Sequence, residues 1–100
     1  MNNITKVSEI TALDIADYIR LDELTTDETN TLNNLLNISK AFILSYTGLA
    51  ADKLDDYPDF VIVVLILCQD MYDNRTLYVD NANLNKVVDT ILGMHVTNLL

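Results

Sequence analysis

The chain has 100 residues, half of them hydrophobic, and six Lys and Arg face fifteen Asp and Glu, which gives a formal net charge of −9. The length suits one domain, and the hydrophobic content excludes a disordered chain. One cysteine excludes a disulfide scaffold, two glycines and one proline disfavour a turn-rich all-β fold, and the scarcity of cations disfavours binding to nucleic-acid phosphates.

No targeting or membrane segment is recognisable in the sequence. The first residues lack a charged region followed by an apolar one, as a secretory signal would have. The longest apolar run, residues 60–68, is shorter than the ~20 residues that a membrane-spanning helix needs. We therefore expect a soluble protein with no membrane partner, made in a reducing cytoplasm where Cys68 stays a buried, unreactive thiol.

The first half of the chain predicts two helices. One spans about residues 12–21, with Thr11 as its N-cap and Asp14 completing a near capping box. The second and clearest helix is capped by Thr26 and ends at Gly48, which suits the left-handed residue after a helix. Its apolar positions recur with helical spacing: Leu32, Leu35, Leu36, Phe42, Ile43 and Tyr46.

The apolar run 60–68 is ambiguous between a strand and a helix. Its β-branched residues suit a buried strand. Met71 and Tyr72 extend the apolar positions, however, and Pro58 suits the first turn of a helix, so a helix is favoured. A helix that is apolar all round belongs in the middle of a bundle or under a partner subunit.

A fourth helix is predicted over about residues 84–92, with Asn83 as its cap and Gly93 as its end. Its apolar positions follow a helical stripe: Leu84, Val87, Val88, Ile91 and Leu92. We therefore predict an all-α fold, a compact bundle of about four helices over residues 1–93. The uncharged tail over residues 94–100 is a possible partner-docking arm.

The residues that could carry chemistry do not form a recognisable catalytic or metal site. The acids between Asp52 and Asp59 lack the spacing of a calcium loop, and their ordinary role is loop solvation beside a helix start. His95 is the only histidine, is expected to be exposed, and cannot make a zinc site with one cysteine. Serines occur at positions 8, 39 and 45, without a nucleophile elbow or a glycine-rich phosphate loop. We predict no enzyme, no cofactor and no metal.

Arg75 follows the most apolar segment and allows two interpretations. A cation at this position complements the C-terminal end of a helix. Alternatively, its guanidinium could reach a carboxylate across an interface, where its fork geometry pairs well.

Three stretches together carry a family resemblance over about residues 8–93. Residues 10–22, ITALDIADYIRLD, form a short helix that ends in a hydrophobic-Arg-hydrophobic-acid step. Residues 45–48, SYTG, end a helix with aromatic-Thr-Gly, and residues 71–75, MYDNR, end one with Tyr-acid-Asn-Arg. In this order they resemble the small helical head–tail connector (adaptor) family of tailed bacteriophages, also described as DNA-packaging or head-completion proteins. Leu49 stands where the family often has a basic residue, and Gly93-Met94-His95 replaces its Tyr-Arg ending.

The resemblance implies a subunit without catalytic activity that forms a homo-oligomeric ring, expected to be twelve-fold on the virion. The ring would lie beneath the portal protein, extend the DNA channel and carry a stopper or tail-completion protein. It would be assembled in the host bacterial cytoplasm, and DNA would pass without specific binding because acidic walls do not hold phosphates. The candidate interface residues are Tyr46, Tyr72, Asp73, Asn74, Arg75, Met94, Val96, Leu99 and Leu100.

A second hypothesis is a small acidic regulatory or inhibitory interaction protein that occupies a nucleic-acid-binding surface by mimicry. Its acids would have to form a regular stripe, whereas here they are spread over all four predicted helices and their connections. A persistent monomer would favour this hypothesis, and a ring would favour the connector.

Overall fold

The computed structural model describes residues 4–96, and within this range the chain is all-α with no strand. Its four α-helices are α1 (Ala12–Tyr18), α2 (Thr26–Thr47), α3 (Phe60–Asn74) and α4 (Lys86–Met94). Short 3-10 helices, η1 to η3, span Val7–Glu9, Ala51–Asp56 and Asn81–Asn83. The predicted all-α bundle of about four helices is confirmed, and the strand alternative for residues 60–68 is excluded.

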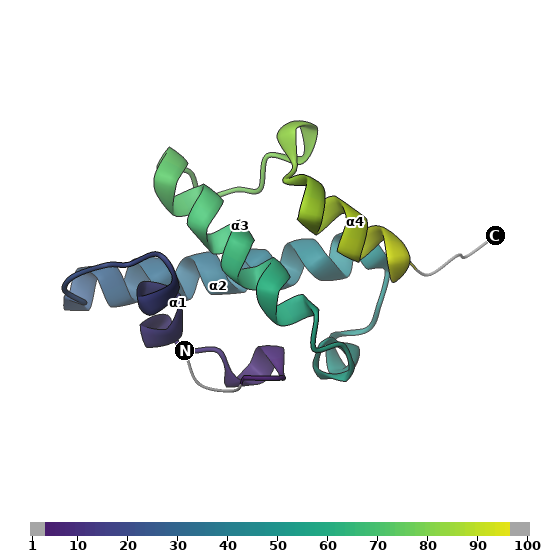
Figure 1. Ribbon diagram of the computed structural model, residues 1–100, viewed down its shortest axis with the longest axis horizontal. Coiled ribbons are helices and arrows are strands. Elements are labelled where there is room, and N and C mark those ends of the chain that lie inside the picture. The colour runs from purple at the N-terminus through teal and green to yellow at the C-terminus, as the bar shows by residue number, and fades with distance from the viewer. Residues whose placement is uncertain (1–3, 97–100) are drawn as a thin grey trace.

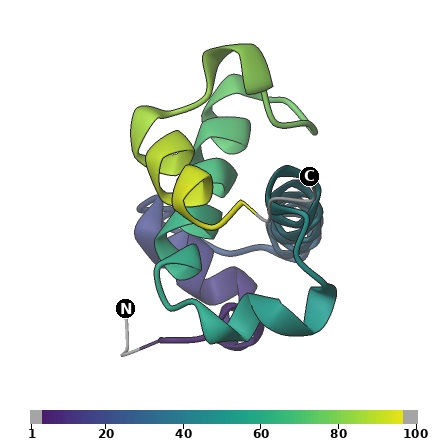
Figure 2. The ribbon, with the colours of Figure 1, turned by 90° about the vertical axis from the view of Figure 1, so that its right-hand side faces the viewer.

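The long helix α2 forms the back of the molecule, and the other three α-helices pack along one side of it (Figures 1 and 2). Helix α3 crosses α2 and lies between α1 and α4, contacting all three. As a result α1 and α4 form opposite flanks of the subunit, and each has one side that no other described residues cover.

Helix α3 is the centre of the hydrophobic core. Its side chains are buried on almost every face, and Val63, Val64 and Leu65 have no exposed surface. Each fully buried aliphatic side chain contributes about 1.5–3 kcal/mol relative to an exposed one. The middle-of-the-bundle interpretation of this apolar helix is therefore confirmed, because neighbouring helices of the same chain cover it.

One polar contact lies inside this core. The Ser39 hydroxyl donates to the Leu35 carbonyl at 2.9 Å, and the Cys68 sulfur lies 3.5 Å from the same hydroxyl. Burial raises the pKa of Cys68 to about 11, partly offset by the contact with Ser39. Because the thiolate is the reactive form, Cys68 is a buried, unreactive thiol as predicted.

The starts of α1 and α2 are set by threonine caps. At α1 the prediction is confirmed: the Thr11 hydroxyl accepts from the Asp14 amide at 3.3 Å, and the Asp14 carboxylate accepts from the Thr11 amide at 2.8 Å. At α2 the predicted cap, Thr26, is wrong by one residue. Thr25 has the extended backbone of a cap, and its hydroxyl accepts from the Glu28 amide at 3.1 Å.

The starts of α3 and α4 differ from the prediction in the same way. Pro58 lies in a turn that precedes α3, which begins two residues later. Asn85, not Asn83, caps α4, because its side-chain oxygen accepts from the Val87 amide at 2.8 Å. Asn83 belongs to η3. Helix starts are thus shifted wherever a better-placed cap or a preceding turn is available.

Left-handed residues end three of the α-helices. Gly48 ends α2 as predicted, with φ 76°, and its amide donates to the Leu44 carbonyl at 2.9 Å. Arg20 adopts φ 61°, so α1 ends at Tyr18 and is shorter than the predicted 12–21. Arg75 ends α3 with φ 56°. Gly93, by contrast, lies within α4 and does not end it, because α4 continues to Met94.

Candidate interaction site

The predicted Tyr-acid-Asn-Arg step forms an ordered end of α3. The Tyr72 hydroxyl donates to the Glu28 carboxylate of α2 at 2.9 Å, and this hydrogen bond is the main reason why the pKa of Tyr72 is raised. The Asn74 side chain donates to the Asp70 carbonyl at 2.8 Å, while Asp73 is exposed. The hydrogen bonds of Tyr72 and Asn74 therefore hold the motif in one conformation.

Arg75 is presented to solvent by this end of α3. Its backbone is the left-handed residue of the helix end, and the following Thr76 amide donates to the Met71 carbonyl at 3.0 Å. Its guanidinium carbon lies 5.9 Å from the centroid of the Tyr72 ring. The exposed side chain therefore rests on an aromatic ring and remains available to a carboxylate.

Tyr46 has a role inside the subunit. Its hydroxyl donates to the Asp89 carboxylate, so that it ties the end of α2 to α4. This hydrogen bond is also the largest cause of the raised pKa of Tyr46. The ring is half-buried beside Phe42, at 5.9 Å between centroids. Tyr46 is thus bonded within its own chain, whatever part it plays in an interface.

The end of α4 contains both a fixed residue and exposed ones. His95 was expected to be exposed, and this is wrong: it is half-buried, with Nε2 2.9 Å from Asp59 Oδ2. Its ring packs against Tyr57 and Phe60, because α4 ends directly above the start of α3. Met94, 66% exposed, and the exposed Val96 flank it. Leu99 and Leu100, the other candidate residues of the tail, lie outside the described residues.

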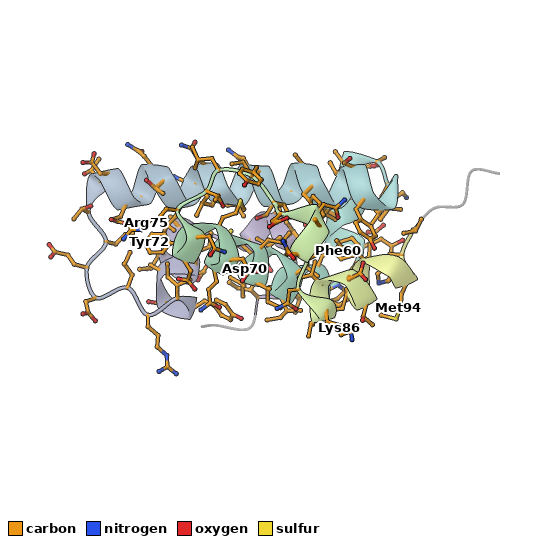
Figure 3. All side chains as sticks on the ribbon, turned by 90° about the horizontal axis from the view of Figure 1, so that it is seen from above. Phe60, Asp70, Tyr72, Arg75, Lys86 and Met94 are labelled. Atoms are coloured by element: carbon orange, nitrogen blue, oxygen red, sulfur yellow. The ribbon has the colours of Figure 1, made fainter. Side chains whose placement is uncertain are left out.

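The predicted interface residues do not form one cluster. Tyr72 and Arg75 lie at one end of the molecule, and Met94 lies at the other (Figure 3). The longest axis of the molecule measures 46 Å. The sequence predicted one set of interface residues, and the structure places those of the α3 end and those of the α4 end on two separate surfaces.

Sequence reasoning missed a third surface, the outer side of α4. Val87 was placed with Val88 in the core stripe, but Val88 is fully buried and Val87 is 50% exposed. Val87, Thr90, Ile91 and Met94 follow one another at helical spacing on this side. The two adjacent valines gave no decisive signal in the sequence, because Val63 and Val64 of the central helix α3 are also adjacent and are both fully buried.

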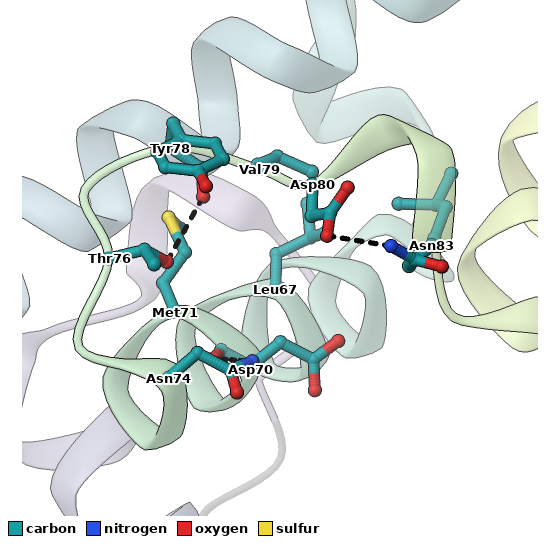
Figure 4. Close-up of a pocket in the computed structure, with 10 residues that line it drawn as sticks. Leu67, Asp70, Met71, Asn74, Thr76, Tyr78, Val79, Asp80 and Asn83 are labelled. Carbon is teal, nitrogen blue, oxygen red and sulfur yellow. Dashed lines mark hydrogen bonds between the residues drawn. The ribbon is translucent and has the colours of Figure 1, made fainter.

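A small pocket of about 90 Å³ lies between α3 and the segment that leads to α4 (Figure 4). It is lined by Leu67, Asp70, Met71, Asn74, Thr76, Tyr78, Val79, Asp80, Asn83 and Leu84. The Asn83 side chain donates to the Asp80 carboxylate at 3.0 Å. Burial, and then the charge of Asp73, raise the pKa of Asp70. The polar groups that line the pocket therefore bond within α3, as Asn74 does, or within the following segment, as Thr76 and Asn83 do.

The geometry of residues 4–96 also bears on a metal site, on the serine and histidine side chains and on a membrane-spanning helix. Within that range no three metal-ligating side chains lie close enough to hold an ion. Ser8 donates to Asp55 and Ser39 to a backbone carbonyl, while the histidine bonds to Asp59. None of the helices in this part of the chain is long and apolar enough to cross a membrane.

Comparison with known proteins adds no relative. No protein-family model, no curated protein and no solved structure matches the chain.

Proposed function

We propose that the chain is a non-enzymatic head–tail connector subunit that forms a ring beneath a phage portal, extends the DNA channel and provides a platform for a stopper or tail protein. The observation that carries this proposal is the exposed end of α3. There the Tyr-acid-Asn-Arg step of the family resemblance is held in place by the Tyr72–Glu28 hydrogen bond, and Arg75 is left free to reach a neighbour.

The arrangement of the surfaces supports a ring. Head-to-tail contacts that close by rotation need two different surfaces on each subunit. The subunit has exposed apolar or cationic groups at both of its ends and on both flanks of α3. With a net charge of −9, contacts through apolar patches and a few opposite-charge pairs are favoured over contacts between acidic faces.

The same charge fits a channel that DNA must traverse. Phosphate binding derives from clustered Lys and Arg, and the chain has only six such residues among its 100. A ring of these subunits would therefore surround the genome without holding it.

The tail beyond α4 is proposed to dock on the portal. Met94 and Val96 are exposed where the chain leaves α4, and His95 fixes the direction of departure through Asp59. An apolar segment of this kind can add to a sheet edge or fill an apolar pocket. Deleting residues 97–100 should leave a folded subunit that no longer binds the portal, and unchanged binding would contradict this docking role.

Native mass spectrometry of the purified chain tests the ring. We expect a closed oligomer, and Arg75→Ala should weaken it while the midpoint of thermal unfolding stays unchanged. Alanine keeps the Cβ, and with it the left-handed backbone strain of position 75, but it removes the rest of the side chain, the methylene stem together with the guanidinium. A lower melting temperature with unchanged assembly would mean that the Arg75 side chain stabilises the end of α3 and takes no part in the ring contact.

The competing proposal, an acidic regulator, has one favourable observation. Asp17, Asp22, Glu23 and Asp27 are all exposed near the junction of α1 and α2. A mimic of nucleic acid would act as a monomer and would compete with nucleic acid for a basic protein. A chain that stays monomeric at high concentration would favour this second function.

A further inference from the structure

The outer side of α4 is an apolar surface that the subunit leaves uncovered. Lys86, Val87, Thr90 and Ile91 line a shallow, almost wholly apolar hollow of about 310 Å³. Met94 continues the same side of the helix by one turn. Lys86 and Met94 both lie on the side of α4 that is turned away from α2 (Figure 3). Inward residues of the same helix, such as Val88, already fill the core.

The opposite flank of the subunit, α1, carries a complementary surface. Leu13 is 58% exposed although its helix neighbours Ala12 and Ile15 are buried. Asp17 lies one turn further along the same side of α1 and is exposed. Asp14, the other acid of this helix, is occupied by its capping box with Thr11.

Charge distinguishes the two flanks. Lys86 begins α4 and Asp17 stands in the last turn of α1, and neither takes part in an ion pair among residues 4–96. Both side chains also oppose the dipole of their own helix, because a cation is unfavourable at a helix N-terminus and an anion at a C-terminus. Neither charge is therefore stabilised by the dipole of its own helix, and both are exposed to a partner.

We infer that copies of this chain associate flank to flank, with α1 of one copy packed on the outer side of α4 of the next. Leu13 enters the hollow beside Val87 and Ile91, and Asp17 pairs with Lys86. This inference rests on the proposed ring and names its subunit contact. Helix α3 lies between α1 and α4, so the two surfaces belong to different flanks of the subunit, and a head-to-tail contact joins two different surfaces.

Helix α1 of a second copy matches the outer side of α4 better than the other exposed apolar surfaces of that copy do. Pairing α4 with α4 would offer Lys86 no free acid of the partner α4, because Asp89 is bonded to Tyr46. Leu77 and Tyr78 are also exposed, but they belong to the segment that leads to α4 and not to the opposite flank. Leu13 and Asp17 of α1 therefore form the surface that matches the outer side of α4.

Cross-linking between two variants that each carry one added cysteine tests the contact directly. Leu13→Cys protein is mixed with Val87→Cys protein and treated with a short bismaleimide. Cys68 is buried with its pKa raised to about 11, so it should not react in the folded protein. We expect a dimer in the mixture and none in either variant alone. A dimer from Val87→Cys alone would overturn the inference in favour of an α4–α4 pair, and Leu77→Cys mixed with Val87→Cys is the matched control, expected to stay monomeric.

Exchanging the charges of Lys86 and Asp17 provides a second test, which needs no cross-linking reagent. Lys86→Glu and Asp17→Lys each improve the match with their own helix dipole, so neither should unfold the subunit. Each alone should reduce the fraction of assembled protein about tenfold or more in native mass spectra, and the double variant should restore it. A ring that forms equally well with either single change overturns the flank contact and leaves the proposed function intact, whereas a chain that never forms a ring contradicts both.

Discussion

Helices α3 and α4 are both rich in apolar residues, but they differ in how much of their surface is buried. Both carry adjacent β-branched residues, yet α3 is buried on almost every face and α4 on one face only. The difference arises from position, because α3 is surrounded by α1, α2 and α4, whereas α4 lies at the flank. An apolar residue is therefore buried according to the neighbours its helix has, and the uncovered valine of α4 identifies the side where a neighbour is missing.

The largest effect should come from the centre of α3. Replacing the fully buried Leu65 by alanine removes three heavy atoms from a packed core and leaves a cavity. We expect the free energy of unfolding to fall by about 2–5 kcal/mol. Urea denaturation followed by circular dichroism measures this loss, and a change below about 1 kcal/mol would show that α3 is not the core.

Val87 and Val88 allow a buried side and an exposed side to be compared within one helix, α4. Val88→Ala should reduce the free energy of unfolding by about 1.5–3 kcal/mol, because its side chain is fully buried. Val87→Ala makes the same chemical change on the exposed side and should alter it by less than about 0.5 kcal/mol. Equal losses for the two variants would mean that both sides of α4 are covered in the monomer.

Tyr72→Phe tests the hydrogen bond that holds the end of α3. We expect a loss of about 0.5–1.5 kcal/mol in the free energy of unfolding, since the Glu28 carboxylate keeps its access to water. The pKa of Tyr72 is raised in the folded state, so its contribution is complete below the ordinary value of 10 and is lost as pH rises through the folded value. The difference between the wild type and the variant should therefore shrink at alkaline pH, and a difference that grows there would contradict the assignment.

The smallest effect concerns the left-handed end of α1. Arg20→Gly removes a side chain from a conformation that costs about 1–2 kcal/mol for residues other than glycine. Glycine also makes the unfolded chain more flexible, which offsets much of the gain. We expect a net stabilisation of a few tenths of a kcal/mol in thermal unfolding, and a clear destabilisation would mean that the Arg20 side chain makes a contact that stabilises the fold.

Much of the fold could be predicted from local patterns. The capping box at Thr11, the left-handed Gly48 and the buried Cys68 each depend on a few neighbouring residues, and each is confirmed. The caps of α2 and α4 were misplaced because two candidate residues stood close together and only the backbone decides between them.

The candidate surfaces were harder to predict because they depend on tertiary position. The sequence does not reveal that His95 reaches Asp59, 36 residues earlier, or that the outer side of α4 lacks a neighbour. The Tyr72–Arg75 step could be found because it is continuous in sequence. Surfaces assembled from separate helices, such as the proposed contact of Leu13 with Val87 of another copy, have no continuous signal in the sequence.

Electron microscopy of the chain mixed with the portal protein encoded in the same genome tests the central proposal most directly. We expect a ring of this chain bound to the portal, coaxial with its channel, in which the α1 flank of each subunit faces the α4 flank of the next. Portal particles that carry no additional ring, with the chain left as a monomer, would contradict it.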